Sequence, residues 1–250
     1  MRSLAMLFVA CATPCALFAQ SAPQDDWHYV IEPYVMFPTI DGTVGIKNLP
    51  DVSLSKGPGD LFSHLQFGAM LYLEAHSNDW AVTSDLLYAN VAETAPSRPV
   101  VTYARADLKE LLWQPAVLYR MTPWLQAGLG ADLTYIQSGL NVTVNTPLGS
   151  LSDSGSRSLS WVDPAVIVRG TFPVSQRWSV MLQGSVGGFD VNSKLIWGTQ
   201  LYGVYRITDL VTFSFGYRAI GDNYETGNGT SRFLYNATMF GPVLRVAFTL

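Results

Sequence analysis

The chain has 250 residues, of which 48% are hydrophobic and only 14% are charged, and its formal net charge is −4. About a quarter of the residues in a typical soluble domain are charged, so this composition argues against an ordinary soluble domain. The small negative charge offers no basic surface, which excludes nucleic acid as an expected partner.

Residues 1–19 are the first expected element, a secretory signal peptide. Arg2 supplies its positive end, an apolar stretch follows, and small residues allow cleavage near Ala19. Cys11 and Cys15 raise the alternative of a lipoprotein anchor, although Phe8 and Pro14 suit that cleavage poorly. Cleavage near Ala19 leaves no cysteine in the mature chain, so neither disulfides nor thiolate chemistry is expected.

Residues 20–250 are expected to form one domain, because roughly 230 residues suit one barrel better than two small domains. Beyond the signal peptide no run of about 18 apolar residues predicts a membrane helix. Ten segments instead alternate apolar and polar residues with the period of two that indicates a β-strand. The expected strands cover residues 27–37, 66–76, 80–92, 108–120, 124–138, 159–172, 178–188, 194–207, 211–220 and 238–250.

The connections between these strands alternate in length. Brief turns at 77–79, 121–123, 173–177 and 208–210 alternate with mostly longer connections, as periplasmic turns and extracellular loops do in outer-membrane barrels. The fold class predicted is therefore all-β: a closed, antiparallel, up-and-down transmembrane β-barrel of ten strands. A merged or missed hairpin would give eight or twelve strands.

Four tryptophans stand at the entrances of odd-numbered strands. Trp27, Trp80, Trp124 and Trp178 each begin an alternating segment. An indole has an apolar ring and a polar N–H, so it suits the boundary between apolar and wet surroundings. We interpret these four residues as the membrane-interface ring at one rim of the barrel.

One face of every expected strand can be chosen so that it carries no charge. Leu129, Val166 and Phe213 are examples of residues on this face. A charged side chain facing lipid at mid-bilayer costs roughly 2–4 kcal/mol, so this face is expected to contact lipid. The alternative is a soluble, lipocalin-like binding barrel, in which the charges would lie outside and the apolar face inside.

The opposite faces carry small residues and the ionisable side chains, which we expect to line the lumen. These residues are Glu32, Glu74, Asp85, Glu110, Arg120, Asp132, Asp163, Arg169, Arg206, Arg218 and Arg245. Most of the acids fall on the first five strands and most of the arginines on the last five. They could pair across the bore and plug it, or they could line a narrow aqueous pore with one acidic and one basic wall.

An outer-membrane enzyme acting on lipid is an alternative from another functional class. Its candidate residues are His64, the adjacent Ser63 and the nearby Asp60, in a segment that could fold as a short helix towards the bore. No spacing of nucleophile, base and orienting group stands out, and a solvated loop histidine explains His64 equally well. We therefore expect no enzyme, no metal and no cofactor.

The last strand alternates up to the final residue, with Leu244, Val246, Phe248 and Leu250 on one face. This pattern resembles the terminal strand by which the barrel assembly machinery recognises outer-membrane proteins. That machinery and outer-membrane lipid are the expected partners. Four prolines, Pro33, Pro115, Pro164 and Pro242, fall inside expected strands, where we expect neighbouring β-bulges to accommodate them.

The chain resembles a broad family of uncharacterised bacterial outer-membrane β-barrel proteins of about 250 residues. The motifs that carry the resemblance are Asp163-Pro164 followed by Arg169, Gly187-Gly188-Phe189, Gly203-Val204-Tyr205-Arg206, Gly216-Tyr217-Arg218 and Gly241-Pro242. The chain departs from the family at Ile167 and Asp190, where such proteins tend to carry glycine. The resemblance implies architecture and location in the outer membrane, and it implies no activity.

The sequence thus predicts an exported outer-membrane barrel that acts as a narrow or plugged channel or as a structural envelope protein. Replacing Arg206 or Arg218 with leucine is expected to change stability or conductance, whereas Arg157→Leu is not.

Overall fold

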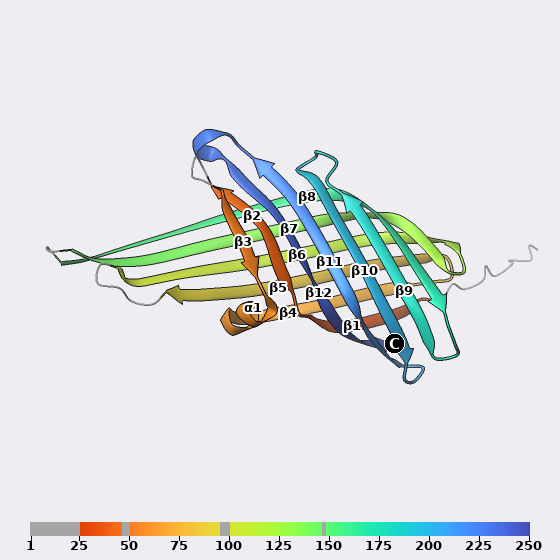
Figure 1. The fold of residues 1–250 in the computed structure, drawn as a ribbon. Coiled ribbons are helices and arrows are strands. Elements are labelled where there is room, and N and C mark those ends of the chain that lie inside the picture. Colours follow the sequence, from red (N-terminus) through yellow and green to blue (C-terminus); the bar gives the residue numbers. More distant parts are fainter. Residues whose placement is uncertain (1–25, 47–50, 96–100, 147–148) are drawn as a thin grey trace, which may run out of the picture.

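The computed structural model describes residues 26–46, 51–95, 101–146 and 149–250, so the expected signal peptide and its cleavage near Ala19 lie outside the described residues. The strands are β1 (His28–Met36), β2 (Thr39–Ile46), β3 (Val52–Lys56), β4 (Leu65–His76), β5 (Trp80–Ala95), β6 (Val101–Thr122), β7 (Leu125–Thr146), β8 (Gly149–Pro173), β9 (Trp178–Gly187), β10 (Ser193–Arg206), β11 (Val211–Thr226) and β12 (Phe233–Thr249). Two short helices, α1 (Pro58–His64) and η1 (Gly229–Ser231), complete the described elements. Figure 1 shows the strands forming a single tilted barrel wall.

The wall is closed by antiparallel pairing between the first and last strands. Each strand from β4 to β12 pairs with the next, and β12 pairs back onto β1, with Val30 opposite Thr249. The two ends of the wall also exchange backbone hydrogen bonds between Tyr29 and Leu250. The predicted ten-stranded antiparallel barrel is thus confirmed, because β1 and β2 occupy one position in the ring.

The segments β1 and β2 continue each other along β12. The lower half of β12 pairs with β1, and its upper half pairs with β2, with Phe233 opposite Ile46. β3 forms a hairpin with β2 and lies outside the ring of ten. Neither the hairpin nor its separation from β1 was predicted, because the sequence between residues 38 and 65 lacks clear apolar alternation.

Three strands extend far beyond the others at the long-loop end (Figure 1). β6 and β7 have 22 residues each and β8 has 25, whereas a tilted strand crosses a bilayer in about 9–11 residues. Much of the sequence expected to form loops at 93–107 and 139–158 is therefore strand. The apolar alternation used for the prediction stops earlier, because strands outside the bilayer need no apolar face.

The four prolines occupy places where the backbone ladder ends or changes partner. Pro33 is the last β1 residue paired with β4, and Pro164 lies just outside the β8–β9 ladder. The pairing of β6 with β7 skips Pro115, and Pro242 lies where β12 changes from β2 to β1. Strand register is continuous at all four prolines, so the expected neighbouring bulges are wrong. A residue without an N–H is tolerated where no ladder bond is required.

The turn from β9 to β10 contains two residues other than glycine with positive φ. Phe189 and Asp190 have φ values of 50° and 60°, and the N–H of Val191 donates to the carbonyl of Gly188 at 2.9 Å. Left-handed conformations favour glycine. Asp190 therefore stands where a glycine would fit the backbone with less strain.

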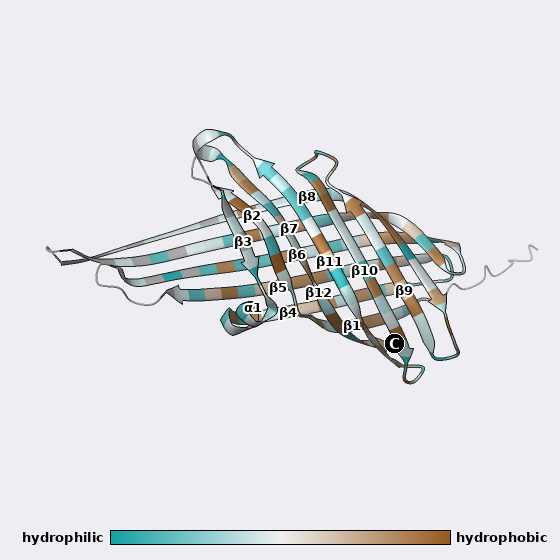
Figure 2. Cartoon of the chain, in the orientation of Figure 1, coloured by the Kyte–Doolittle hydropathy of each residue, from teal (hydrophilic) through white to brown (hydrophobic). Residues whose placement is uncertain are grey.

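The apolar face of the wall points outward, and Figure 2 shows hydrophobic and hydrophilic residues alternating along the strands of the wall. Leu129 is 68% exposed, and Val166 and Phe215 are also exposed. The four interface tryptophans lie together at the short-turn end and are 42–47% exposed. Asp85, Arg169 and Arg218 are instead buried inside the barrel. This arrangement is the reverse of a lipocalin-like barrel, in which the apolar face would point inward.

The substitution Leu129→Arg tests this sidedness. We expect it to lower the free energy of unfolding by roughly 2–4 kcal/mol, because it places a charge on the middle of the lipid-facing wall. Leu210→Arg, in the exposed turn before β11, is the matched control and should cost at most about 1 kcal/mol. Urea unfolding of protein refolded into vesicles measures both, and equal costs would contradict the assignment of the outer face.

Candidate functional site

Three buried ion pairs lie in the middle of the bore. Arg218 Nη1 lies 3.0 Å from Asp85 Oδ2, and Arg245 Nη2 lies 3.0 Å from Glu32 Oε2. Arg169 contacts Glu74 through both terminal nitrogens, with Nη2 donating to Oε1 at 3.1 Å. Two of the pairs join strands on opposite walls: β4 with β8, and β5 with β11. The separation of acids and arginines along the sequence therefore produces pairing across the bore.

Tyrosine side chains fill the space between these pairs. The Tyr34 hydroxyl donates to Asp85 Oδ1 at 2.7 Å and accepts from Arg218 Nη1 at 2.9 Å. The Arg245 guanidinium carbon lies 4.7 Å from the ring centre of Tyr72, 5.0 Å from that of Tyr202 and 5.3 Å from that of Tyr34. Cation–π contacts strengthen when water is excluded, so the rings and the charges form one packed cluster.

A layer of side chains separates the two halves of the bore. On β10, Gln200 lines a cavity on the long-loop side and Val204 lines a cavity on the short-turn side, whereas Tyr202 between them lines neither. We call this layer the partition; its members are no more than 6% exposed. The partition consists of Tyr34, Tyr202 and Val243 from one buried cluster and of Leu118 and Ile167 from a second.

Below the partition lies a wide vestibule of about 760 Å³ that opens at the short-turn end. Arg120 and Arg206 line this vestibule, but both are exposed at its mouth. They therefore differ from the buried arginines with which the sequence grouped them. The Arg206 side chain donates to the backbone carbonyl of Gln176 in a neighbouring turn. Because Arg206 is exposed, its charge stays in contact with solvent.

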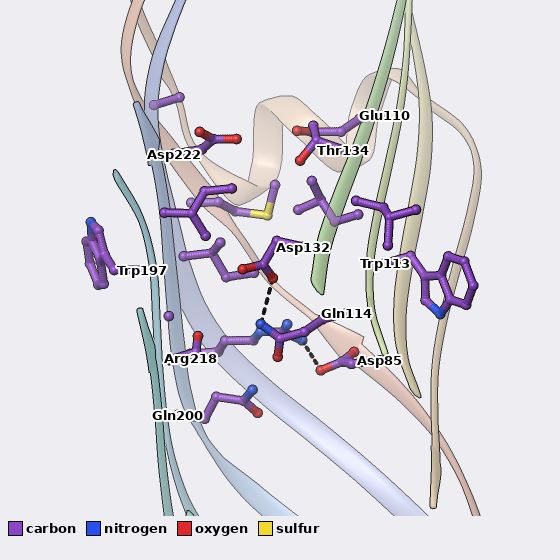
Figure 3. A pocket seen from close by; sticks show the side chains of 18 of the residues that line it. Asp85, Glu110, Trp113, Gln114, Asp132, Thr134, Trp197, Gln200, Arg218 and Asp222 are labelled. Carbon is purple, nitrogen blue, oxygen red and sulfur yellow. Dashed lines mark hydrogen bonds and ion pairs between the residues drawn. The ribbon is translucent and has the colours of Figure 1, made fainter. Parts of the chain in front are cut away.

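Above the partition, Glu110 and Asp132 face a small cavity of about 60 Å³ (Figure 3). Asp132 accepts from the Gln114 side chain at 2.6 Å, and Glu110 accepts from the Tyr235 hydroxyl at 3.0 Å. Asp163 is fully buried beside the β9–β10 turn and accepts from the backbone N–H groups of that turn. Among the described residues these acids form no ion pair within 4 Å. Neutral donors reach them, although Asp132 Oδ2 is buried without a hydrogen-bond partner.

Asp222 is an interior acid that the sequence analysis did not assign to the lumen. It lies on β11 and accepts from the Trp161 indole at 3.2 Å, while Trp161 stacks on Tyr224. The expected strand stopped at residue 220, so the alternation that places Arg218 inside was not continued to Asp222. The inward tyrosines were missed because the inner face was identified from charged, amide and small side chains, and aromatic residues were assigned to the lipid side.

The histidine considered for an enzyme site lies on α1. His64 Nδ1 is 2.8 Å from the Asp60 carbonyl oxygen and 3.0 Å from Ser63 Oγ. A carbonyl only accepts hydrogen bonds, so Nδ1 must carry the proton in this contact. A protonated Nδ1 cannot accept a proton from Ser63, so this pair lacks the geometry of a nucleophile and its base.

An exposed network holds the long-loop end together. Arg232 contacts Asp51 at 2.7 Å and Glu225 at 3.0 Å, and Lys194 contacts Glu225 at 2.8 Å. The hydrogen bond from Arg232 lowers the pKa of Asp51.

Within the described segments there is no group of three or more potential ligands that could hold a metal ion. In those same segments, no helix combines the length and apolar character needed to span a membrane.

Solved structures with a similar fold are outer-membrane proteins. The chain matches the outer membrane protease OmpT of Escherichia coli with a TM-score of 0.50 and 8% identity, over 91% of this chain and 98% of that one. It has the fold of an outer-membrane β-barrel protein. The toluene transporter TodX of P. putida matches with a TM-score of 0.40, 10% identity and coverage of 92% and 91%. Ail, the attachment invasion locus protein of Yersinia pestis, matches with a TM-score of 0.38 and 9% identity, over 90% of this chain and 98% of that one.

No protein-family model and no curated protein matches the chain. The resemblance to outer-membrane barrels in general is therefore supported by structure, whereas the narrower family predicted from sequence motifs stays a prediction. A fold by itself assigns no activity.

Proposed function

We propose that this chain is an outer-membrane barrel whose bore is closed at rest: a plugged channel or a structural envelope protein. The observation that carries the proposal is the partition together with the three ion pairs beside it. A buried charge needs a partner, and each of these arginines has a carboxylate oxygen within about 3 Å. A narrow pore with one acidic and one basic wall would leave those charges facing water.

The proposed orientation places the short turns in the periplasm and the extended ends of β6, β7 and β8 outside the cell. Both described termini then lie on the periplasmic side, as an even number of strands requires. The exposed apolar wall makes outer-membrane lipid the proposed partner of the barrel. The outward residues of β12, including Phe248, are the proposed contact for the assembly machinery.

Single-channel recording in planar bilayers tests the closed bore. We expect refolded wild-type protein to give no stable open level, because the partition blocks the axis of the barrel. Gel mobility with and without heating should first show that the inserted protein is folded. A reproducible conductance step from folded protein would contradict the closed bore and favour the narrow pore.

The proposal includes no enzymatic activity. The contact of His64 Nδ1 with the Asp60 carbonyl oxygen supports this. Incubating the wild type and His64→Ala with labelled outer-membrane lipids tests it. A lipid-modifying activity that disappears in His64→Ala would overturn this part of the proposal.

A further inference from the structure

The barrel wall has an interruption in its long-loop half. The ladder between β1 and β4 ends at Pro33 and Leu71. Above this point β4 pairs with β5 on one side, while β2 has turned away to pair with β12 and β3. In the described parts of the chain, no strand pairs with the other edge of residues 65–70. We call this interruption the wall gap.

The helix α1 occupies the connection across the wall gap. It begins with Pro58 in its first turn, a position that suits proline because no helical N–H is lost there. Phe62 on this helix contacts Phe37 on the outer wall, with ring centres 5.4 Å apart. The helix is seven residues long and has no buried residue, so it covers the gap loosely instead of sealing it.

Behind the wall gap lies a cavity of about 370 Å³ inside the barrel. This volume falls within the range of about 300–1,000 Å³ that is typical of small-molecule sites. The cavity is lined mainly by apolar side chains from α1 and from the surrounding strands. Its principal apolar residues are Met36, Ile40, Leu61, Met70, Leu87 and Met239.

The outside of the wall gap is apolar as well. Val35 and Phe37 on one side, Phe67 on the other and Phe62 on α1 are all exposed. They continue the apolar wall that faces lipid, so the gap opens at the level of the hydrocarbon. The cavity and the membrane interior are therefore both apolar, and the wall gap beside the unpaired edge of β4 lies between them.

We propose that the cavity binds a hydrocarbon chain that enters sideways from the membrane through the wall gap. An apolar chain gains free energy there by filling space lined with methionine and leucine, as in other apolar pockets. Lys56 is the one lysine or arginine that lines the cavity among the described residues, and it forms an ion pair with Glu93 at 3.5 Å. Asp60, Asp107 and Glu110 also line the cavity, so the lining offers no unpaired lysine or arginine to select an anionic head group. The cavity therefore recognises the hydrocarbon tail of the ligand, and the head group remains at the wall gap. This inference goes beyond the closed bore and does not depend on it.

Photolabelling in vesicles tests the proposal. The probes are palmitic acid with a diazirine at the end of its chain and a phosphatidylethanolamine carrying the same labelled chain. After irradiation, peptide mapping should find label on the inward residues Met70, Leu87 and Met239 in addition to the outer wall. Labelling by the free acid alone would identify a fatty acid as the ligand, and labelling by both probes would identify a membrane lipid chain.

Gly68→Leu should block the site. Gly68 lines the cavity on the unpaired edge of β4, and an added Cβ would meet only Leu65 and the Tyr88 carbonyl oxygen at 3.5 Å or more. Interior labelling should fall about tenfold, a loss of about 1.4 kcal/mol, while labelling of the outer wall is unchanged. Ala69→Leu adds the same bulk to the lipid side of the strand and is the matched control.

Leu87→Trp, which fills the cavity from β5, provides a second blocking variant if Gly68→Leu does not fold. Label confined to outward residues in the wild type would overturn the proposal, because it would show that other parts of the chain fill the cavity. Equal interior labelling in wild type and in a folded blocking variant would also overturn it. A barrel that conducts ions but takes up interior label would contradict only the closed bore.

Discussion

Arg218→Leu should lower the free energy of unfolding by about 3–5 kcal/mol. The substitution leaves Asp85 buried without its cation, and an uncompensated buried charge is among the costliest defects in a protein. It also removes the donor to the Tyr34 hydroxyl. Urea unfolding of the refolded barrel, followed by tryptophan fluorescence, measures the loss through the shift of the transition midpoint.

Arg206→Leu is the control for this prediction, because the same residue type is removed from the exposed mouth of the vestibule. Its cost should stay within about 0.5 kcal/mol, as for most surface substitutions. The sequence grouped Arg206 with Arg218, and the structure separates them by burial. Equal losses in the two variants would contradict the assignment of Arg218 to a buried pair.

A double-mutant cycle with Asp85→Leu separates the pair from its surroundings. The double variant Asp85→Leu/Arg218→Leu should be more stable than Arg218→Leu alone, because replacing both charges removes the unpaired one. A double variant as unstable as the sum of the two single variants would show that packing, and not charge pairing, explains the loss.

Tyr202→Ala should convert a silent barrel into one with measurable current. Tyr202 is 1% exposed and lies between the residues that line the two halves of the bore. Its truncation removes one of the two tyrosines of the partition and leaves space beside Tyr34 and Arg245. The variant should also lose about 3–5 kcal/mol of stability, as large-to-small changes of buried aromatic residues do.

The matched control is Tyr205→Ala, which truncates a tyrosine on the same strand that faces the other way. The Tyr205 ring lies 4.7 Å from the Trp178 ring, tilted by 42°, at the short-turn end of the outer wall. Single-channel recording should show open levels for Tyr202→Ala and none for Tyr205→Ala. If Tyr202→Ala and Tyr202→Ala/Val243→Ala are both folded and both silent, the partition is not what closes the bore.

The closed bore and the wall gap suggest different routes for different molecules. Water-soluble molecules meet packed tyrosines and paired charges along the axis of the barrel. Apolar chains meet an opening in the side of the wall, next to lipid. The two routes lie at different places in the barrel, so the conductance and labelling experiments examine them separately.

Which face of each strand points to lipid, and the ring of ten strands, could be predicted from the sequence alone. Period-two alternation fixes which residues share a face, and the cost of a charge in lipid fixes which face points outward. Leu129 and Arg218 could therefore be assigned to opposite sides without coordinates. The outer tryptophans and the short turns indicated which end of each strand belongs to which rim.

The sequence did not predict which charges pair, where the bore closes or where the wall opens; these features are seen only in the folded structure. Glu74 and Arg169 are 95 residues apart, and the strand alternation of each says nothing about which partner lies across the bore. The hairpin β2–β3 and the gap beside β4 depend on where the ladder from β1 stops. Backbone pairing at such edges is set by closure of the whole ring, which is a property of all ten strands together.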